Sequence, residues 1–439
     1  MVASRFRKIG VVGLGYIGTP TAVMFANSGL QVLGIDVVKE KVEAINAGKC
    51  VIAEPGLPEA LAKAVKDGKL HASADASGLK ECDAVIICVE TPLEEKTKNP
   101  NYSALKSASE TVGRNLKKGA LVLVESTLAP GTAKNIVIPA IEKESKLKAG
   151  EGFGFAHCPE RIIPGKMMKE IIENDRVIGG YGKKDAQEAA ELYYNFVKGK
   201  IYLTNETTAE VVKVIENTFR DVNIAFANEI ARVCASLGVN VNEAIELANK
   251  HPRVNIHQPG AGVGGHCIPK DPYLLMHSVE GKCETKLVKT AREINEGMPH
   301  FTVQLVQDAF RGAGANLKGA RIAILGVAYK ADTDDCRDAP ALKIINELKG
   351  FGAEVIAYDS YVHEGDKKKF GVEFAGSVSS AVKGSDAIVI VTDHSEIRKV
   401  ALIEIAKQGM RTKIIIDGRN CVNRKEAEAN GFVFRAIGR

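Results

Sequence analysis

Short runs of apolar residues in the N-terminal part of the chain predict the strands of a parallel sheet. The runs lie within residues 8–12, 31–36, 83–89 and 120–124, and turn-forming residues bound each of them. Their apolar residues do not alternate with polar ones, which is typical of strands covered on both faces. A helix of small residues, predicted over 19–28, connects the first two strands as a βαβ unit. We therefore expect a parallel sheet with helices on both sides.

The same pattern returns near the C-terminus. Apolar runs lie at 320–327, 354–359, 386–391 and 413–417, and a helix is predicted from about 339 to 350. This half lacks a full glycine fingerprint, but its strands and helices predict a second open α/β domain of similar architecture. The expected fold class is α/β, with two Rossmann-like doubly wound domains.

A long helix is predicted between the two halves, because apolar residues recur there at intervals of three or four. They are Ile215, Phe219, Val222, Phe226, Ile230, Val233 and Leu237. Thr207 and Glu210 have the spacing of a capping box, which predicts that the helix starts near them. A helix of about 30 residues is long enough to join two domains. Its apolar stripe packs either against a second copy of itself or inside an intramolecular bundle, and the pattern alone does not decide.

Composition and charge limit the classes of protein to consider. The chain has 439 residues, 45% of them hydrophobic, which is enough for two or three domains. A net charge of +5 without a stripe of lysine and arginine does not favour nucleic-acid binding, although it suits a small anionic ligand. No apolar run reaches about 18 residues, so we expect no membrane segment and a cytoplasmic location. The nine cysteines form no CxxC pair, and no metal site is predicted.

A glycine-rich turn between the first predicted strand and helix has the pattern of a dinucleotide-binding site. Gly13 can form the tight turn, Gly15 lets the backbone approach a pyrophosphate, and Gly18 allows close packing of the helix. Asp36, at the end of the second strand, is placed to accept hydrogen bonds from a ribose, and its charge favours NAD over NADP. Lys41 on the following helix either reaches the adenosine or is a solvated lysine. A glycine turn without a ligand is the alternative, but strand, helix and acid together favour NAD.

The loop over residues 259–272 is the most unusual segment of the chain, since four glycines in six residues precede a cysteine. Such a backbone can wrap closely around a ligand and expose amide donors. Cys267 would project from this loop as a nucleophile, with Asp271 near enough to share one site. An isolated cysteine is more often a buried packing residue, but the surrounding glycines favour the nucleophile.

Three polar residues share one face of the long helix. Lys213, Asn217 and Arg220 are spaced i, i+4 and i+7, opposite the apolar stripe. By itself this arrangement is typical of a solvated face. In a chain with a dinucleotide site and a candidate nucleophile, an ammonium, an amide and a guanidinium together favour a substrate clamp.

These residues belong to a longer series of motifs. The series comprises Gly13–Gly18, Glu125-Ser-Thr127, Cys158-Pro-Glu160-Arg161, Lys213 with Asn217, Gly264–Asp271, Tyr329-Lys330, Asp334-Asp335 and Arg337. In these motifs and their order, essentially the whole chain resembles the UDP-glucose/GDP-mannose dehydrogenase family. Within the family, segments 251–255 and 262–267 look most like the enzymes that act on UDP-N-acetylmannosamine, with UDP-N-acetylglucosamine enzymes close behind.

The resemblance implies an NAD-dependent oxidation of a UDP-sugar, in which the C6 alcohol becomes a carboxylate in two steps. Cys267 would hold the aldehyde as a thiohemiacetal and then as a thioester. The residues implied to stabilise the oxyanion are Lys213 and Asn217, and those implied to position or activate water are Asp271, Glu160 and Thr127.

The resemblance also implies which residues bind the two ligands. The NAD site would be lined by Tyr16, Ile17, Asp36, Lys41, Thr91, Thr127 and, from the C-terminal domain, Arg337. The UDP-sugar would be held by Lys213, Asn217, Arg161, Ile162, Arg220, His251, Arg253, Gly264, Tyr329 and Lys330, whose positive charges suit a diphosphate. Three domains are implied: an NAD-binding domain over 1–198, a central helical domain with the cysteine loop over 199–300, and a UDP-sugar-binding domain over 301–439. The central helix is expected to form a homodimer or a larger homo-oligomer.

One departure from the family bears on the substrate. UDP-glucose enzymes carry a second glutamate shortly after the position of Glu160, where this chain has Arg161-Ile-Ile, so plain UDP-glucose is in doubt. A UDP-N-acetylglucosamine or UDP-glucose 6-dehydrogenase remains an alternative. More distant alternatives are a two-electron dehydrogenase of the 6-phosphogluconate type, which needs no Cys267, and a non-catalytic sensor of NAD or nucleotide sugars. Residue types do not decide the sugar epimer, the oligomer size or the pathway.

Overall fold

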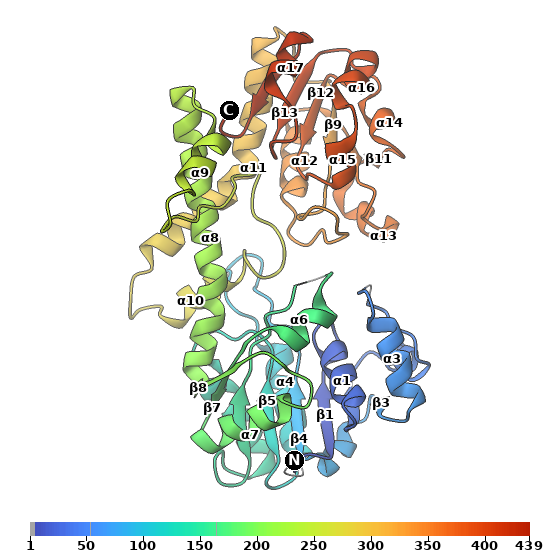
Figure 1. Cartoon of the computed structure of the whole chain (residues 1–439), viewed down its shortest axis with the longest axis vertical. Coiled ribbons are helices and arrows are strands. Elements are labelled where there is room, and N and C mark those ends of the chain that lie inside the picture. The colour runs from blue at the N-terminus through green and yellow to red at the C-terminus, as the bar shows by residue number, and fades with distance from the viewer. Residues whose placement is uncertain (1–4, 53, 164) are drawn as a thin grey trace. The chain divides into compact units, whose positions relative to one another are not determined.

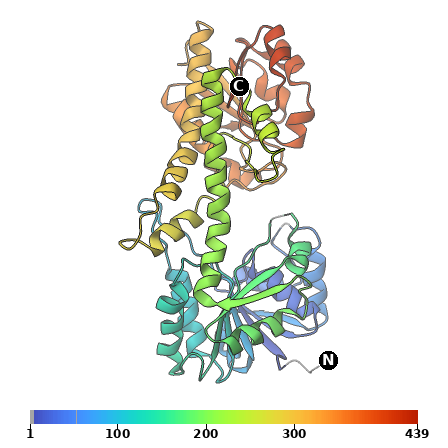
Figure 2. The same cartoon turned by 60° about the vertical axis from the view of Figure 1, so that its left-hand side comes forward.

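The computed structural model describes residues 5–52, 54–163 and 165–439, which form two compact units (Figure 1). The first unit extends to Glu216 and includes Tyr273–Lys282, and the second contains Asn217–Pro272 and Cys283–Arg439. The division falls within α8 (Glu206–Leu237), a single helix of 32 residues that Figure 2 shows without interruption. The long helix predicted from the sequence is confirmed.

A sheet of eight strands forms the centre of the first unit, in the order β3-β2-β1-β4-β5-β6-β7-β8. The strands are β1 (Lys8–Val12), β2 (Gln31–Ile35), β3 (Leu70–Ser73), β4 (Ala84–Ile87), β5 (Leu121–Val124), β6 (Gly154–His157), β7 (Arg176–Gly180) and β8 (Ile201–Asn205). All neighbouring strands pair parallel except β6 and β7, which pair antiparallel. The predicted parallel sheet is confirmed.

Helices cover both faces of this sheet. The helices of the unit are α1 (Gly18–Asn27), α2 (Lys39–Asn46), α3 (Leu57–Lys66), α4 (Ser103–Arg114), α5 (Ile138–Ser145), α6 (Met167–Glu173) and α7 (Lys183–Tyr193), with a 3-10 helix at Ala76–Glu81, a π-helix at Ala133–Val137 and most of α10 (Asp271–Ser278). Consecutive strand residues point to opposite faces: Val85 joins the cluster beneath α4 and α5, and Ile86 the cluster beneath α1 and α3. Burial on both faces explains why the strands read as unbroken apolar runs.

The second unit repeats this plan with six parallel strands, in the order β11-β10-β9-β12-β13-β14. The strands are β9 (Arg321–Leu325), β10 (Glu354–Tyr358), β11 (Glu373–Phe374), β12 (Ala387–Ile390), β13 (Ile414–Asp417) and β14 (Val433–Ala436). The helices are α9 (Val241–Ala248), α11 (Lys286–Gly312), α12 (Pro340–Gly350), α13 (Glu364–Lys367), α14 (Val378–Val382), α15 (Ser395–Lys399), α16 (Leu402–Gly409) and α17 (Arg424–Ala429), with a 3-10 helix at Lys368–Phe370. Residues of α8, α11 and α12 pack on one face, and those of α14 and α16 on the other. The second Rossmann-like domain is confirmed.

The start of α8 differs from the sequence prediction. The helix begins one residue before Thr207, so the capping box with Glu210 is wrong. Asn205 caps the helix instead, because its Oδ1 accepts a hydrogen bond from the N–H of Thr208 (2.9 Å). Glu210 is fully buried and binds a loop that lies far away in sequence.

The apolar stripe of α8 is largely exposed. Phe219 is 62% exposed, Phe226 48% and Leu237 70%. Lys213 and Asn217, on the polar side of the helix, are buried. The exposed residues of the stripe do not pack inside an intramolecular bundle, so this alternative is wrong for them. In the described part of the chain, no helix is both long and apolar enough to cross a membrane.

Candidate active site

The turn between β1 and α1 contains three glycines with different surroundings. Gly13 has a φ of +93°, and a Cβ on it would lie 2.5 Å from the carbonyl oxygen of Cys88. A Cβ on Gly18 would lie 1.8 Å from the carbonyl oxygen of Gly13. Around Gly15, in contrast, no atom of the described residues lies within 4 Å of an added Cβ. Packing thus requires the first and third glycines, while the second leaves the start of α1, after Ile17, open to a diphosphate.

Asp36 follows β2 and accepts three hydrogen bonds. Its Oδ2 accepts from the N–H of Leu14 (2.9 Å) and from Nζ of Lys41 (2.7 Å), and its Oδ1 accepts from the N–H of Val38 (3.0 Å). Burial raises the pKa of Asp36, but the bonds from Lys41, Val38 and Leu14 outweigh burial and lower the pKa below its usual value. The carboxylate is therefore charged at neutral pH, and Lys41 is held against it.

The loops after β4 and β5 are tied together. Oγ1 of Thr91 donates to the carbonyl oxygen of Thr127 (2.8 Å), and Oγ of Ser126 donates to the carbonyl oxygen of Val89 (2.6 Å). Because β4 and β5 are parallel neighbours, both loops leave the carboxyl edge of the sheet, where Rossmann-like sheets bind ligands. The structure brings the two threonines of the predicted NAD site into direct contact.

Glu160 follows β6 and is fixed through both carboxylate oxygens. Oε1 accepts from the N–H of Arg161 (2.7 Å), and Oε2 lies 3.1 Å from Nη1 of Arg176 in a buried ion pair. The guanidinium of Arg161 pairs with Glu216, and Ile162 beside it is half-buried. Arg176 was not among the predicted site residues, because no spacing rule signals a partner that comes from another strand.

Lys213 is buried on α8, with 8% of its surface exposed. His157, at the end of β6, is also buried, and its Nδ1 donates to the carbonyl oxygen of Val124 (2.9 Å). Burial lowers the pKa of His157 to about 4; the bond to Val124 opposes this shift, and the charge of Lys213 adds to it. His157 is therefore neutral at physiological pH, and Lys213 supplies the positive charge of this region.

Glu210, one turn before Lys213, ties α8 to the loop that begins at Thr127. Its carboxylate accepts from the N–H groups of Gly131 (2.6 Å) and Ala133 (2.7 Å). Burial raises the pKa of Glu210 to about 7, although the two hydrogen bonds oppose the shift. The side chain holds a loop with one predicted catalytic residue against the helix turn that carries another.

In the second unit, the cysteine loop contacts the polar face of α8. Nδ2 of Asn217 donates to Oδ2 of Asp271 (2.6 Å), and both side chains are buried. The N–H of Asp271 donates to the carbonyl oxygen of Cys267 (2.9 Å), which closes a turn at the start of α10. Cys267 itself is exposed. The structure thus brings three predicted catalytic residues together and leaves the thiol-bearing residue accessible.

Gly264 and Gly265 lie tightly against the segment that follows β9. A Cβ on Gly264 would lie 2.6 Å from the Cβ of Tyr329, and one on Gly265 would lie 2.8 Å from the tyrosine ring. The N–H of Gly265 donates to the carbonyl oxygen of Arg337 (2.9 Å). Only glycine permits this approach, so the cysteine loop and the segment with Tyr329 form one packed structure.

The other predicted ligand-binding side chains are exposed at the surface of their units. They are Tyr16 in the first unit and Arg220, His251, Arg253, Lys330 and Arg337 in the second. Nδ1 of His251 accepts a weak bond from the N–H of Arg253 (3.3 Å), and Arg337 forms a bidentate ion pair with Asp335. Exposure leaves these side chains accessible to a ligand.

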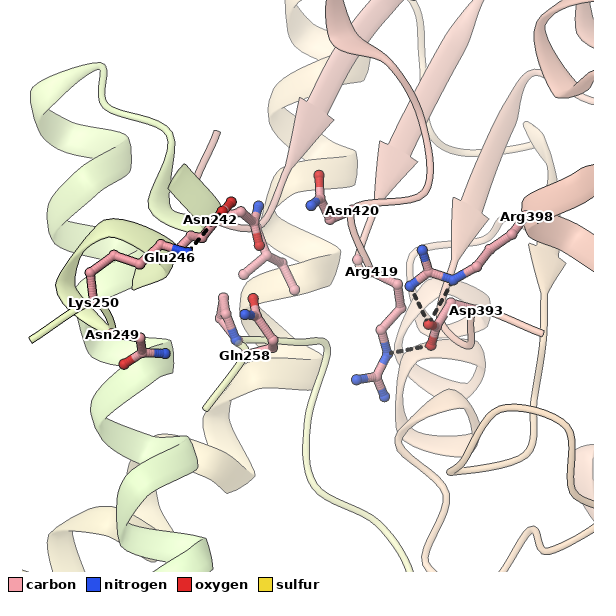
Figure 3. A pocket seen from close by; sticks show the side chains of 12 residues that line it. Asn242, Glu246, Asn249, Lys250, Gln258, Asp393, Arg398, Arg419 and Asn420 are labelled. Carbon is pink, nitrogen blue, oxygen red and sulfur yellow. Dashed lines mark hydrogen bonds and ion pairs between the residues drawn. The ribbon is translucent and has the colours of Figure 1, made fainter. Parts of the chain in front are cut away.

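A cavity of about 470 Å³ in the second unit is lined by an arginine that the sequence analysis missed (Figure 3). Nε of Arg419 donates to the carbonyl oxygen of Val391 (2.8 Å) and lies 4.0 Å from Oδ1 of Asp393. A Cβ on Gly260, at the start of the cysteine loop, would lie 2.7 Å from Nη1 of Arg419. Burial lowers the pKa of this arginine. Its place just after a strand, like that of Asp36, is the signal that could have found it.

Three segments of the chain match the UDP-glucose/GDP-mannose dehydrogenase family. Residues 7–197 match its NAD binding domain, residues 207–297 its central domain and residues 323–424 its UDP binding domain. Together the three matches account for most of the chain.

Individual proteins resemble the chain over its whole length. A UDP-N-acetyl-D-mannosamine dehydrogenase of Pyrococcus horikoshii is 48% identical over 432 residues, covering 98% of this chain and 99% of that protein. The structure of a UDP-D-ManNAc dehydrogenase from the same organism has a TM-score of 0.91 and 47% identity, with 98% of this chain and 99% of that chain covered. An NDP-N-acetyl-D-galactosaminuronic acid dehydrogenase structure from Methanosarcina mazei has a TM-score of 0.89 and 36% identity, with 99% and 95% covered.

Proposed function

Because this chain belongs to the UDP-glucose/GDP-mannose dehydrogenase family and is an NAD-dependent oxidoreductase of nucleotide sugars, we propose that it oxidises UDP-N-acetyl-D-mannosamine to the uronic acid. The reaction converts the C6 alcohol to a carboxylate through a thioester on Cys267. One observation carries the mechanism: Cys267 is exposed on a glycine-built turn that is bonded to the buried Asn217–Asp271 pair. The Pyrococcus relative is named a UDP-N-acetyl-D-mannosamine dehydrogenase, and this name supports the choice of sugar.

The glycine turn fits the cofactor. Gly15 leaves open space at the start of α1, which suits a diphosphate, and the charged Asp36 suits the ribose hydroxyls. NAD, when bound, accepts one hydride in each of the two oxidations. The other residues of the proposed NAD set are Gly13, Gly18, Tyr16, Ile17, Lys41, Thr91, Thr127 and Arg337.

The thioester route balances with two NAD and one water as the only reactants besides the sugar. After the first oxidation, the Cys267 thiolate adds to the aldehyde carbon, and the former carbonyl oxygen takes a proton. The second oxidation removes a hydride from the same carbon while the hydroxyl loses its proton, and a thioester remains. Water then attacks, the carbon–sulfur bond breaks, and the water oxygen becomes the second oxygen of the carboxylate.

Buried polar side chains suit the two charged steps. We assign Lys213 and Asn217 to the developing oxyanion, because a positive charge and an amide donor stabilise it best in a desolvated environment. We assign Asp271 to the activation of water, with Glu160 and Thr127 as further positioning groups. These roles rest on the resemblance to the family and on the burial of Lys213, Asn217, Asp271 and Glu160.

The substrate set contains several cations, which suit a diphosphate. Its members are Lys213, Asn217, Arg161, Ile162, Arg220, His251, Arg253, Gly264, Tyr329 and Lys330. A site built for an N-acetyl group provides hydrogen-bond partners for its amide. A sugar with only a hydroxyl at that position leaves these partners unpaired, and the site therefore rejects it. UDP-glucose should therefore be a poor substrate.

The proposal is tested by counting NADH produced from a panel of UDP- and GDP-sugars. We expect two NADH for each UDP-N-acetylmannosamine consumed, without free aldehyde, and the highest kcat/KM for this sugar. One NADH per sugar at completion would favour the two-electron dehydrogenase instead. A preference for UDP-N-acetylglucosamine would change the product and retain the mechanism, whereas a preference for UDP-glucose over both would reject the substrate assignment.

The exposed stripe of α8 supports a homodimer as part of the proposal. Apolar side chains such as Phe219 and Phe226 are costly to leave in water along one helix face, and a second copy would bury them. By family resemblance, Arg253 would reach the sugar bound by the second copy. The nine cysteines are scattered along the sequence without the spacing of a disulfide framework, so a cytoplasmic location is also part of the proposal.

Sedimentation of Phe226→Glu tests the dimer. We expect the unsubstituted protein to sediment as a dimer or larger oligomer, and the variant to shift towards monomer with loss of activity, because a buried charge opposes association. Glu229→Gln, at an exposed polar position of the same helix, is the control and should not shift. A fully active monomer of the unsubstituted chain would contradict the proposal.

A further inference from the structure

The second unit repeats the backbone geometry of the NAD-binding turn at the end of β9. The N–H of Gly326 donates to the carbonyl oxygen of Tyr358 (2.8 Å), as that of Gly13 donates to Ile35 (2.8 Å). Both glycines have a positive φ, +77° and +93° respectively. The two sheets therefore make the same turn after their central strand.

The acid that follows the next strand is also repeated. Oδ2 of Asp359 accepts from the N–H of Val327 (2.7 Å), and Oδ2 of Asp36 accepts from that of Leu14 (2.9 Å). In the first unit this acid is the proposed ribose ligand. Its counterpart in the second unit, Asp359, accepts from the equivalent backbone N–H, that of the residue directly after the turn glycine.

A histidine side chain blocks access to the carboxylate of Asp359. Nε2 of His394 lies 2.9 Å from Oδ2 of Asp359, and the two residues are only 1% and 3% exposed. The ring of Tyr361 stacks on that of His394, with centroids 4.7 Å apart and planes at 16°. The carboxylate that could bind a ribose is thus occupied by a side chain of the protein itself.

His394 uses its second nitrogen to hold the following segment. Nδ1 accepts a hydrogen bond from the N–H of Asp332 (2.9 Å). Accepting at Nδ1 while donating from Nε2 to Asp359 requires the neutral tautomer with its proton on Nε2. Burial raises the pKa of Asp359, but the hydrogen bonds from His394 and from the backbone N–H groups of Ala328 and Val327 lower it below its usual value, so the acceptor stays charged.

Two more contacts tie the segment to the neighbours of His394. The Asp332 carboxylate accepts from the N–H (2.8 Å) and Oγ (2.5 Å) of Ser395, and Oγ1 of Thr392 donates to the carbonyl oxygen of Ala328. Residues 328 and 332 are therefore both anchored to the stretch 392–395. Tyr329 and Lys330 lie between these two anchors.

The anchored segment in turn supports the nucleophile loop. The ring and Cβ of Tyr329 fill the space beside Gly265 and Gly264, and the N–H of Gly265 binds the carbonyl oxygen of Arg337. Cys267 follows two residues later. A shift of Tyr329 would be transmitted to this loop, because the glycines leave no space to absorb it.

We propose that His394 is a positioning residue, which with Asp359 fixes the segment 327–332 and, through Tyr329, the loop that carries Cys267. This inference rests on the proposed function in so far as Cys267 is the nucleophile. In the second unit, Asp359 takes the position of the ribose-binding acid in a dinucleotide turn, but it anchors a loop of the protein instead of a ligand. The consequence is that kcat and thiol reactivity, rather than NAD affinity, depend on His394.

The test compares His394→Gln with the unsubstituted enzyme by steady-state kinetics and by the rate at which iodoacetamide alkylates Cys267. A glutamine cannot reach both Asp359 and the backbone of Asp332 in the geometry of the ring, so we expect kcat to fall about tenfold or more. The alkylation rate of Cys267 should also change severalfold, while KM for NAD stays within about twofold. His300→Gln, an exposed histidine paired with Glu347, is the control and should change none of these.

A second variant guards against a folding defect. Asp332 has a φ of +59°, which asparagine tolerates, so Asp332→Asn keeps the backbone and weakens the bonds that the carboxylate accepts from Ser395 and Tyr361. We expect the same direction of change at a smaller size, with an unchanged circular dichroism spectrum. Unchanged kcat and alkylation in both folded variants would overturn the inference. If the unsubstituted protein oxidises no sugar, the proposed function fails, but the alkylation rates still decide the role of His394.

Discussion

Replacing Cys267 with serine is expected to reduce the four-electron turnover by about a thousandfold or more, because a hydroxyl is scarcely ionised at neutral pH and is a far weaker nucleophile than a thiol. The turn around residue 267 is held by backbone bonds, so the serine should not disturb the loop. NAD binding should persist, since the glycine turn and Asp36 lie in the other unit. Steady-state NADH formation and titration with NAD measure the two effects separately.

Cys283→Ser is the matched control, because Cys283 is the other exposed cysteine. It should leave turnover unchanged. Survival of activity within about tenfold in the Cys267 variant would show that this cysteine only packs in the loop. Loss of NAD binding in the same variant would instead indicate a general defect of the protein.

The second large effect is expected for Asp271→Asn. This variant should produce a burst of NADH and then turn over slowly. The amide cannot act as a general base, and such a loss costs about 100- to 10,000-fold in the step concerned. Formation of the thioester needs Cys267 and should continue, so the thioester accumulates after the first turnover. Rapid-mixing measurements should give up to two NADH per subunit before the slow phase, and mass spectrometry should find the sugar bound to Cys267.

Asp308→Asn, an exposed aspartate on α11, is the control for this substitution. It should show normal turnover without a burst. A uniformly slow first turnover in the Asp271 variant, without a burst, would place Asp271 before the thioester and contradict its assignment to hydrolysis. Asn217 loses its carboxylate partner in the Asp271 variant, so the thermal unfolding midpoint of this variant should be measured as well.

The elements that could be predicted are those in which burial is periodic along the chain. The apolar runs at 83–89 and 386–391 became β4 and β12, with ends shifted by one or two residues. The glycine turn at Gly13–Gly18 was also evident, because each glycine there has a steric or ligand-related reason. Local rules are sufficient for such features.

The features that were missed depend on partners far away in sequence. Glu210 fits a capping box by spacing, but its side chain binds two backbone amides of a distant loop. Arg176 and His394 complete buried carboxylates whose positions are decided only when strands assemble. The stripe of α8 had the period of a core helix, and periodicity cannot tell a core from a surface that awaits a partner.

The exposure of Cys267 has a cost in an oxidising environment. Several other thiols are protected: burial raises the pKa of Cys82 to about 11 and those of Cys158 and Cys421 to about 12, which suppresses the reactive thiolate. Cys267, in contrast, is exposed, because in the proposed mechanism it must admit a sugar aldehyde, and it therefore also admits peroxide. Conversion of its thiol to a sulfenic acid would remove the nucleophile while the fold stays intact. Oxidative damage to this enzyme should thus first appear as lost turnover, reversible by a thiol reductant, in a protein that still folds and binds NAD.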